Sequence, residues 1–365
     1  MKFSIALAAL MVAGSSASLL KSPSYYEGKF EAWMKEHSIE ISKEEYDVRL
    51  GHFSELDDRI ELHNAKNMTY TLGHNEYSHM SWEEFREAKN IGSPMPEKPH
   101  LLGLSRDESN KHTADGPPAF ADHWWCFADW MPFCGDSPSD NDDIDMTSDW
   151  VEKGGVTDVK DQGSCGSCWS FSTTGAVEGA YFLKTGSLVA FSEQQLVDCD
   201  IDGDDAGCNG GLMDNAFKWI KSNGGLCKED DYAYKAKQGT CQTTCEEVDG
   251  SAVSAWVDVQ QSDKAMESAL DQQPVSIAIE ADQRDFQSYS GGVLTASCGT
   301  NLDHGVLAVG YGTMKFEGAD DIDYYRVKNS WGPSWGKDGY IYLERGVSQS
   351  GGQCGMLMAA SYPVL

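Results

Sequence analysis

A cysteine at the end of a glycine-rich loop is the first residue in this sequence whose position suggests chemistry. Residues 161–171 read DQGSCGSCWSF, and Cys168 stands where this loop enters a predicted buried helix over 169–184. The helix dipole and the unsatisfied backbone N–H groups at a helix start favour a thiolate, which is the nucleophilic form of cysteine. The chain has eleven cysteines, and an odd count leaves one thiol free if the others form disulfides. Cys168 is therefore the candidate nucleophile.

Two polar residues further along the chain supply what a thiolate needs for acyl transfer. His304 opens a predicted strand in the sequence DHGV, and Asn329 follows another predicted strand in KNSWG. An imidazole can pair with the thiolate and later protonate a leaving amine. An amide can orient that imidazole by accepting its second N–H, as the third member of a catalytic triad does. Trp331, two residues after Asn329, would shield this hydrogen bond from water.

The elements that must position these residues change character along the second half of the chain, where helical patterns come first and strand patterns follow. The predicted helices cover 169–184, a segment opened by the capping box over 192–195, and 212–222, which two glycines end at 224–225. The predicted strands cover 274–279, 305–311, 324–328 and 340–343. This order indicates an α+β fold with a helical half and a sheet half. A cleft between two such halves is a natural place for a substrate.

A helical stripe also marks the N-terminal part of the chain. Residues recur every three to four positions at Glu45, Arg49, Phe53, Leu56, Ile60 and Asn64. A helix with this pattern has little core of its own, so we expect it to pack against another part of the protein. A second helix is expected to begin at the capping box SWEE over 81–84.

Composition and charge exclude several classes of protein. Of the 365 residues, 40% are apolar and 11% are aromatic, which is typical of a globular chain. The formal net charge is −30, so binding to nucleic acid or to anionic lipid is not expected, because both need an excess of Lys and Arg. A chain this acidic repels itself near neutral pH, which fits an acidic working compartment.

The N-terminus and the cysteines indicate the secretory pathway. Lys2, the apolar run over 3–12 and the small residues over 13–17 predict a signal peptide over residues 1–17. The alternative is an N-terminal membrane anchor, which the short apolar run disfavours; no other stretch approaches the ~20 apolar residues of a membrane span. Eleven cysteines are also typical of an oxidised protein outside the cytosol.

Residues 111–149 have an unusual composition. The segment 124–134 is densely aromatic and contains Cys126 and Cys134, whereas the segment 136–149 has six Asp and no Lys or Arg. We predict that the acidic segment is exposed and extended, like segments that proteases cut. The aromatic segment has two interpretations: a small hairpin that covers apolar surface, or a second latch over the cleft.

These motifs together resemble the papain-like cysteine proteases, most closely the cathepsin L type. CGSCW over 165–169 matches the signature C-G-[SA]-C-[WY], with His304 136 residues and Asn329 161 residues after the nucleophile. The resemblance implies a papain-like fold, with a helical lobe, an antiparallel sheet or barrel lobe and the active-site cleft between them. It implies that Cys168 is the nucleophile, His304 its ion-pair partner and Asn329 the orienting residue. Gln162 resembles the side-chain donor of the oxyanion hole, which would act beside the Cys168 backbone N–H.

The resemblance also implies which residues contact a substrate. The glycines of CNGG over 208–211 let a substrate backbone lie close, and apolar side chains line the main specificity pocket. The implied substrate-binding residues are Gly210, Gly211, Leu212, Met213, Ala278, Leu302, Asp303, Trp331 and Ala359. The pocket positions are apolar or small, and none is acidic. We therefore expect a bulky apolar or aromatic residue at P2, the second residue before the scissile bond, and poor acceptance of Arg there.

The helical stripe resembles the ERFNIN-type pattern of the family's inhibitory prodomain, with Leu56 where the pattern has Asn. GHNEYSH over 73–79 resembles the following GxNxFxD element, with Tyr77 in place of Phe and His79 in place of the acid. Acid-triggered release through that carboxylate is therefore not expected here. The expected domains are a signal peptide over 1–17, an inhibitory prodomain over 18–110, a linker over 111–143 in the activation-cleavage region, and a peptidase domain over 144–365. Cleavage is expected between Asp136 and Ile144.

The remaining cysteines are expected to form disulfides. The family pattern implies Cys165–Cys208, Cys199–Cys241 and Cys298–Cys354, and local pairing of the others gives Cys126–Cys134 and Cys227–Cys245, although sequence alone does not fix connectivity. A zinc or redox site at 165–168 is disfavoured because no second close cysteine pair has the right spacing. No metal or cofactor is expected. Asn67 is in the only N-glycosylation sequon.

The sequence therefore predicts a cysteine endopeptidase made as a secreted zymogen. No second histidine pair or carboxylate-anchoring insert is evident, which disfavours an exopeptidase. Two alternatives stay open: a peptide ligase or transpeptidase that uses the same thioester, and a catalytically silent binding or storage homologue. The expected partners are peptide and protein substrates, the chain's own prodomain as an intramolecular inhibitor, and cystatin-type inhibitors. We expect a monomer that binds neither nucleic acid nor membranes and works outside the cell or in a lysosome or vacuole.

Overall fold

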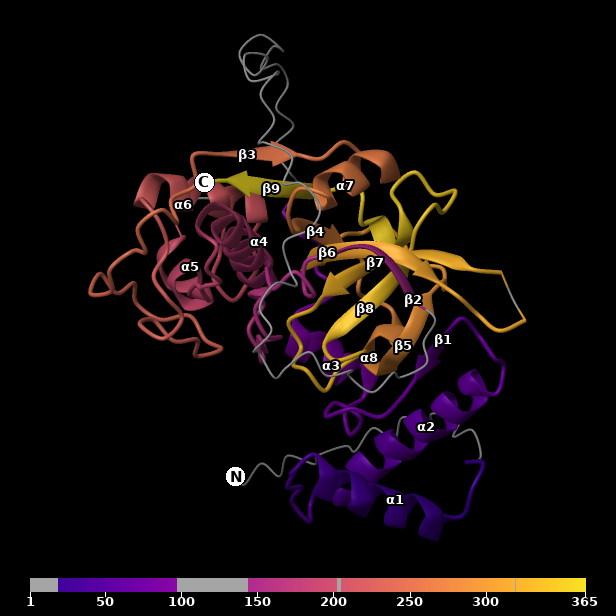
Figure 1. Ribbon diagram of the computed structural model, residues 1–365. Helices are drawn as coiled ribbons and strands as arrows, with labels where there is room; N and C mark the ends of the chain where they lie inside the picture. Colours follow the sequence, from indigo (N-terminus) through magenta and orange to yellow (C-terminus); the bar gives the residue numbers. More distant parts are fainter. Residues whose placement is uncertain (1–18, 97–143, 202–204, 319) are drawn as a thin grey trace, which may run out of the picture.

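The computed structural model describes residues 19–96, 144–201, 205–318 and 320–365. The expected signal peptide, the aromatic linker with Cys126 and Cys134, and nearly all of the expected cleavage region lie outside these residues. Within the described residues, no helix is both long enough and apolar enough to cross a membrane. Figure 1 shows a helical N-terminal unit, a helical lobe and a sheet lobe.

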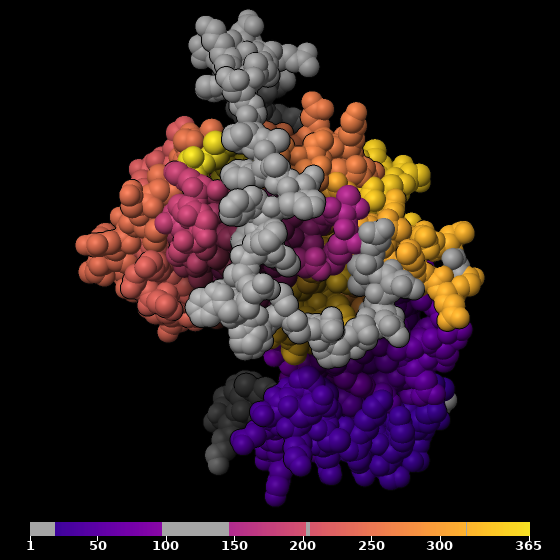
Figure 2. Space-filling view, viewed as in Figure 1, coloured from indigo at the N-terminus to yellow at the C-terminus, as the bar shows by residue number. Residues whose placement is uncertain are grey.

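The N-terminal unit is a small helical body attached to the rest of the molecule. Helix α1 (Pro23–Glu36) and helix α2 (Tyr46–Asn64) are followed by strand β1 (Tyr70–Leu72) and helix α3 (Trp82–Lys89). Figures 1 and 2 show α1 and α2, in indigo, as a projection at the lower edge of the molecule. Its own core consists of three buried aromatic side chains, Phe30, Trp33 and Phe53. The predicted helix with little core of its own is thus confirmed.

Polar residues of the helical stripe join α2 to the segments that follow it. Arg49 Nη1 lies 2.6 Å from Glu84 Oε2 of α3. Asn64 Nδ2 donates to Leu72 O at 2.8 Å, and Leu72 N donates back to Asn64 Oδ1 at 3.0 Å, which holds β1 against the end of α2. Helix α3 begins at the predicted capping box, because the Ser81 hydroxyl accepts from Glu84 N and the Glu84 carboxylate accepts from Ser81 N.

The helical lobe contains the three helices predicted for it. They are α4 (Cys168–Thr185), α5 (Glu193–Cys199) and α6 (Met213–Asn223). Gly186 (φ 75°) and Gly224 (φ 93°) end α4 and α6 in the left-handed conformation that glycine adopts without strain. At α5 only half of the predicted capping box forms: Ser192 Oγ accepts from Gln195 N, but Gln195 Oε1 accepts from Cys227 N instead.

The sheet lobe contains a nine-stranded sheet that is mostly antiparallel. Its strands follow the order β1-β5-β8-β7-β6-β4-β9-β3, β2 pairs with β6, and only β5 and β8 run parallel. Beyond β1, the strands are β2 (Ile144–Asp149), β3 (Ala255–Asp258), β4 (Val275–Ile279), β5 (Tyr289–Leu294), β6 (His304–Met314), β7 (Ile322–Lys328), β8 (Tyr340–Glu344) and β9 (Ala360–Val364). Helices α7 (Asp263–Leu270) and α8 (Arg284–Ser288) and the 3-10 turn η1 (Gln353–Gly355) complete the lobe. The papain-like arrangement of a helical lobe and a sheet lobe is confirmed.

Five strands, β1, β2, β3, β5 and β9, come from segments in which the sequence predicted none. Strand β1 of the N-terminal unit pairs with β5, with Tyr70 opposite Gly292. The prediction that residues 136–149 are exposed throughout is wrong at their end, since Ser148 and Asp149 are buried in β2. Arg326 Nη1 lies 2.6 Å from Asp149 Oδ2, so an ion pair compensates the burial of this carboxylate.

Four disulfides close loops within the peptidase part of the chain. They join Cys165 to Cys208, Cys199 to Cys241, Cys227 to Cys245 and Cys298 to Cys354. These are the three pairs that the family pattern implies and one of the two local pairs. Cys126–Cys134 lies outside the described residues. Asn67, the glycosylation candidate, is exposed in the turn between α2 and β1.

Candidate active site

The nucleophile candidate stands at the start of the central helix of the helical lobe. Cys168 is the first residue of α4, and it is the free cysteine of the described chain. Its neighbour Cys165 is bonded to Cys208, so residues 165 and 168 form neither a redox disulfide nor half of a zinc site here. The start of α4 packs against the start of β6, since a side chain at Gly305 would begin 3.2 Å from the Trp169 backbone.

His304 begins strand β6 and Asn329 directly follows strand β7, and these two strands are neighbours in the sheet. His304 Nε2 lies 2.7 Å from Asn329 Oδ1, and Asn329 Oδ1 also accepts from Ser330 N at 2.8 Å. The Trp331 ring stacks on the imidazole, with the ring centroids 4.8 Å apart. Both His304 and Trp331 are fully buried. The orienting hydrogen bond and its tryptophan shield therefore lie together, as the sequence predicted from KNSWG.

The second imidazole nitrogen is the one available for chemistry. His304 Nδ1 is buried and has no hydrogen-bond partner, while Nε2 is held by Asn329. His304 is followed by Gly305, which packs against the backbone of Trp169, the residue after Cys168. This arrangement leaves Nδ1 as the atom that can exchange a proton with the thiol.

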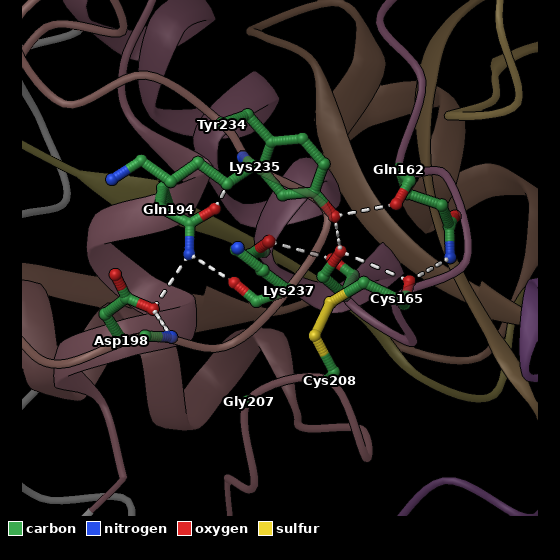
Figure 3. The surroundings of a disulfide bond; sticks show 12 residues. Gln162, Cys165, Gln194, Asp198, Gly207, Cys208, Tyr234, Lys235 and Lys237 are labelled. Atoms are coloured by element: carbon green, nitrogen blue, oxygen red, sulfur yellow. Dashed lines mark hydrogen bonds between the residues drawn. A yellow bond between two sulfur atoms is a disulfide. The ribbon is translucent and has the colours of Figure 1, made fainter.

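Gln162 lies near the start of the nucleophile loop, residues 161–168. Its side chain is fully buried; Nε2 donates to Cys165 O at 3.0 Å and Oε1 accepts from Ser330 Oγ at 2.7 Å. Figure 3 shows Gln162 beside the Cys165–Cys208 disulfide, with the Tyr234 hydroxyl donating to Gln162 O at 2.8 Å. The amide is thus fixed at both ends, which is what a preorganised donor to a developing oxyanion needs.

The Cys165–Cys208 disulfide also connects the nucleophile loop to the glycine loop. Gly166 N donates to Cys208 O at 2.9 Å, so the two loops run side by side. At Gly211 a side chain would overlap the Trp169 ring, whereas the space around Gly210 is open and its φ is 113°. An open, backbone-lined edge of this kind is available to an extended peptide.

Four of the residues expected to line the specificity pocket lie close together. Met213, Ala278, Leu302 and Ala359 belong to one apolar cluster. The side chain of Met95, from the segment after α3, packs into the same cluster, and Met95 N donates to Leu302 O at 2.8 Å. Leu212 does not belong to this cluster; it caps the start of α6, and its N–H donates to Asp205 Oδ1.

The N-terminal unit covers the candidate site. Residues 90–96 and the cleft wall at Gly166, Cys168, Gly210 and Gly211 line one narrow space. Gly92 N donates at 2.9 Å to the buried carboxylate of Asp303, which the sequence had placed among the substrate-binding residues. The segment over 90–96 therefore contacts the helical lobe, at Gly166, and the sheet lobe, at Asp303.

Two residues of the N-terminal unit, Tyr77 and Lys89, cover the site next to Trp331. The motifs indicated Tyr77 but not Lys89. Tyr77 OH donates to Trp331 O at 2.7 Å, and the aromatic position of the GxNxFxD-like element indicated this residue. Lys89, at the end of α3, has 3% of its surface exposed and donates to Tyr77 OH at 2.9 Å and to Asp161 Oδ1 at 3.2 Å. A buried lysine carries no motif signal, because its role depends on a carboxylate from another domain.

Burial beneath this cover changes the protonation of the two reacting groups. Burial raises the pKa of the Cys168 thiol to about 11. Burial lowers the pKa of His304 to about 4; the Asn329 hydrogen bond opposes this shift and the charge of Lys89 adds to it. Between these values both groups are neutral, so the covered form does not hold the thiolate–imidazolium pair. Burial also raises the pKa of Asp303 to about 6.

The assembled groups suit acyl transfer. A thiol at a helix start, an imidazole oriented by an amide and a fixed amide donor are the parts of a nucleophilic mechanism with an oxyanion hole. An apolar pocket on one side of the nucleophile would hold a substrate side chain in place.

Comparison with known proteins agrees with this arrangement. Residues 144–364 match the papain family cysteine protease domain, and residues 30–85 match the cathepsin propeptide inhibitor domain (I29). Vignain from Ricinus communis is 42% identical over 340 residues, which is 92% of this chain and 85% of that protein. The cysteine endopeptidase RepA from Oryza sativa subsp. japonica is 52% identical over 227 residues, 62% of this chain and 59% of that protein. The crystal structure of the ragweed pollen allergen Amb a 11, a cysteine protease in its proform, has a TM-score of 0.72 at 33% identity and covers 94% of this chain and 96% of that chain.

Proposed function

Because this chain belongs to the papain family of cysteine proteases and carries a propeptide inhibitor domain, we propose that it is an endopeptidase synthesised as a secreted zymogen. The observation that carries the proposal is the free Cys168 at the start of α4, beside a His304 that Asn329 orients. The propeptide inhibitor domain is the chain's own intramolecular inhibitor.

The proposed reaction begins when the prodomain leaves and water reaches the dyad. His304 Nδ1 takes the Cys168 proton, and the sulfur attacks the peptide carbonyl carbon. Gln162 Nε2 and the Cys168 backbone N–H hold the resulting oxyanion. The C–N bond then breaks, the imidazolium proton goes to the leaving amine, and a thioester remains.

Water completes the cycle. His304 takes a proton from the water as it attacks the thioester carbonyl, and a second tetrahedral intermediate forms in the same donor site. Collapse breaks the C–S bond and releases the carboxylic acid product. Cys168 regains a proton or stays ion-paired with His304. A ligase would follow the same path with an amine in place of the water.

The apolar pocket supports the proposed preference at P2. Met95 of the segment after α3 packs against the apolar cluster that contains Met213, Ala278 and Ala359. An unbranched apolar side chain in this place is consistent with a bulky apolar or aromatic P2 residue.

The four disulfides support a protein that matures in the secretory pathway. We propose that it works outside the cell or in a lysosome or vacuole as a monomer, that proteins and peptides are its substrates, and that cystatin-type inhibitors bind its cleft. Cleavage between Asp136 and Ile144 would release the peptidase domain with strand β2 at its N-terminal end. The N-terminal sequence of the active enzyme tests this boundary, and a start before Cys126 would overturn it.

The proposed activity is tested by expressing the full chain and acidifying it. We expect a drop in mass and the appearance of activity on a fluorogenic peptide with Phe at P2, but not on its counterpart with Arg at P2. Cys168→Ala is expected to lose at least about 10⁴-fold in activity, because the nucleophile is removed. An enzyme that matures but only joins peptides would favour the ligase, and one that labels with no thiol-directed inhibitor would favour the silent homologue.

A further inference from the structure

Within the described residues, three ion pairs join the prodomain to the peptidase, and each of them has its cation on the prodomain. Arg59 pairs with Asp285, Arg86 with Asp282 and Lys89 with Asp161. When the prodomain leaves, three carboxylates of the peptidase lose their partners together. Two of them, Asp161 and Asp282, lie beside the cleft.

Asp282 borders the path of the chain that occupies the cleft. Arg86 Nη2 donates to Asp282 Oδ2 at 2.6 Å, and Arg86 Nε lies 2.6 Å from Oδ1. A side chain at Gly92 would overlap the Arg86 guanidinium and would begin 2.8 Å from Asp282 Oδ2. The Asp282 N–H also donates to Asp303 Oδ2, the same oxygen that accepts from Gly92 N. Asp282 is therefore adjacent to the backbone that crosses the site.

Asp161 approaches the same region from the nucleophile loop. It immediately precedes Gln162 and forms a bridge with Trp331. Its Oδ1 accepts from the buried Lys89 at 3.2 Å, and 40% of its side chain is exposed even in the covered form. Both carboxylates are thus within reach of an incoming peptide.

The apolar pocket fixes which part of a substrate meets these carboxylates. Met95 packs against the apolar cluster assigned to P2. Lys89, at the other end of the covering segment, contacts Asp161 and Tyr77, and the Tyr77 hydroxyl donates to Trp331 O. A substrate with P2 in the pocket places the residues that follow the scissile bond toward this other end. Asp161 and Asp282 therefore face the leaving-group half of the substrate.

We propose that Asp161 and Asp282 form an acidic subsite that favours Lys or Arg among the first three residues after the scissile bond. In the zymogen, Lys89 and Arg86 of the prodomain occupy the positions that substrate cations take in the mature enzyme. The inference rests on the proposed endopeptidase function and deepens it. Because the two carboxylates are partly exposed, salt should weaken their effect.

The test uses mature enzyme obtained by acid processing of the full chain. Internally quenched peptides share Phe at P2 and carry Lys, Gln or Glu at the first, second or third position after the scissile bond. We expect kcat/KM to be about ten-fold higher for Lys than for Glu at one or more of these positions, with the ratio falling as ionic strength rises.

Variants locate the effect. Asp282→Asn and Asp161→Asn should each lower the Lys-to-Glu ratio about three-fold or more, with kcat/KM for the Gln peptide nearly unchanged. Asp285→Asn is the matched control, because it also removes a prodomain ion pair, but neither Asp285 nor its partners Arg59 and Tyr70 belong to the described lining of the space around Cys168. The control should keep the wild-type ratio.

The outcomes separate this inference from the function on which it rests. A wild-type ratio near one at all three positions, with normal cleavage of the Gln peptide, overturns the subsite and leaves the endopeptidase intact. No cleavage of any peptide overturns both. An equal loss of the ratio in Asp285→Asn also overturns the subsite, since a diffuse surface charge would then act. The wild-type peptides decide the question even where a variant does not mature.

Discussion

The prodomain and the peptidase domain are held together by different interactions. The peptidase part has four disulfides, eight of the nine strands of the sheet and most of two large apolar clusters. Residues 19–96 contain no cysteine and five of the nine histidines of the chain. The separate core of this unit is three aromatic rings, and the unit docks through ion pairs, one short strand, an extended segment and a group of apolar side chains. The apolar side chains that join the cluster of the sheet lobe are Ile60, Tyr70, Leu72, Tyr77, Phe85 and Ile91.

This difference matches what each part must do. A disulfide or a buried sheet persists across a wide range of pH, whereas a small aromatic core with buried histidines and interface ion pairs depends on protonation. His304 is the only histidine of the 144–365 region. The account therefore predicts that acid acts on the inhibitor first and leaves the enzyme folded.

The largest effect is expected from removing the centre of the prodomain core. Phe53 is fully buried against Phe30 and Trp33, so Phe53→Ala should cost the prodomain about 3–5 kcal/mol. The variant zymogen would then expose its cleft at neutral pH, so its activity before processing should approach that of the processed enzyme. Leu62→Ala, at an exposed position of α2, is the matched control and should stay latent. Equal latency of the two variants would contradict a separate, weak prodomain core.

An intermediate effect is expected where the inhibitory segment crosses the cleft. Gly92 has a φ of 84° and no room for a side chain beside Arg86 and Asp282. Gly92→Ala should weaken docking by about 1–3 kcal/mol and so accelerate activation roughly ten-fold or more. Gly51→Ala, in open space on α2, should not. Activation rates measured at one pH by cleavage of the fluorogenic peptide compare them, and identical rates would contradict tight docking at Gly92.

The smallest effect, and the one most specific to the comparison, concerns pH. Burial lowers the pKa of His74 and of His79 below the ordinary 6.5; the Asp57 carboxylate opposes the shift at His74. The unfolded prodomain then binds more protons than the folded one, so this contribution to stability is present above pH 6.5 and is lost as pH falls through the lowered folded values. Acid release through histidine can thus operate although His79 stands where the family pattern has an acid.

The pH effect is measured as unfolding of the prodomain in the Cys168→Ala zymogen, which cannot process itself. His74→Gln should flatten the loss of stability between neutral pH and pH 5, and His37→Gln, at the less buried end of α1, should not. If both variants retain the wild-type pH profile, protonation of His74 does not contribute to release.

Sequence reasoning found the residues with local motifs and missed those with distant partners. Cys168, His304 and Asn329 each stand in a recognisable motif, and the helix stop at Gly224 follows from backbone chemistry. Strand β1 has only three residues, and its pairing with β5 has no local signal. The acidic composition before Trp150 predicted exposure because the sequence does not show that Arg326 neutralises Asp149.

The contacts in the cleft also divide into residues that a local motif indicates and residues whose partners are distant in the sequence. The resemblance implied Met213 and Ala278 as pocket residues, but neither the packing of Met95 against their apolar cluster nor Lys89 as a cover for the dyad could be predicted. Both depend on how the prodomain docks, and a docking geometry is a property of two surfaces rather than of one motif.

The central claim is that the docked prodomain suppresses the reactivity of Cys168. The direct measurement is the rate at which iodoacetamide alkylates the Cys168 peptide, followed by mass spectrometry, in the zymogen at neutral pH and in the acid-processed enzyme. We predict a rate at least about 100-fold lower in the zymogen, because the buried thiol is protonated and covered. Equal rates in the two forms would contradict the claim.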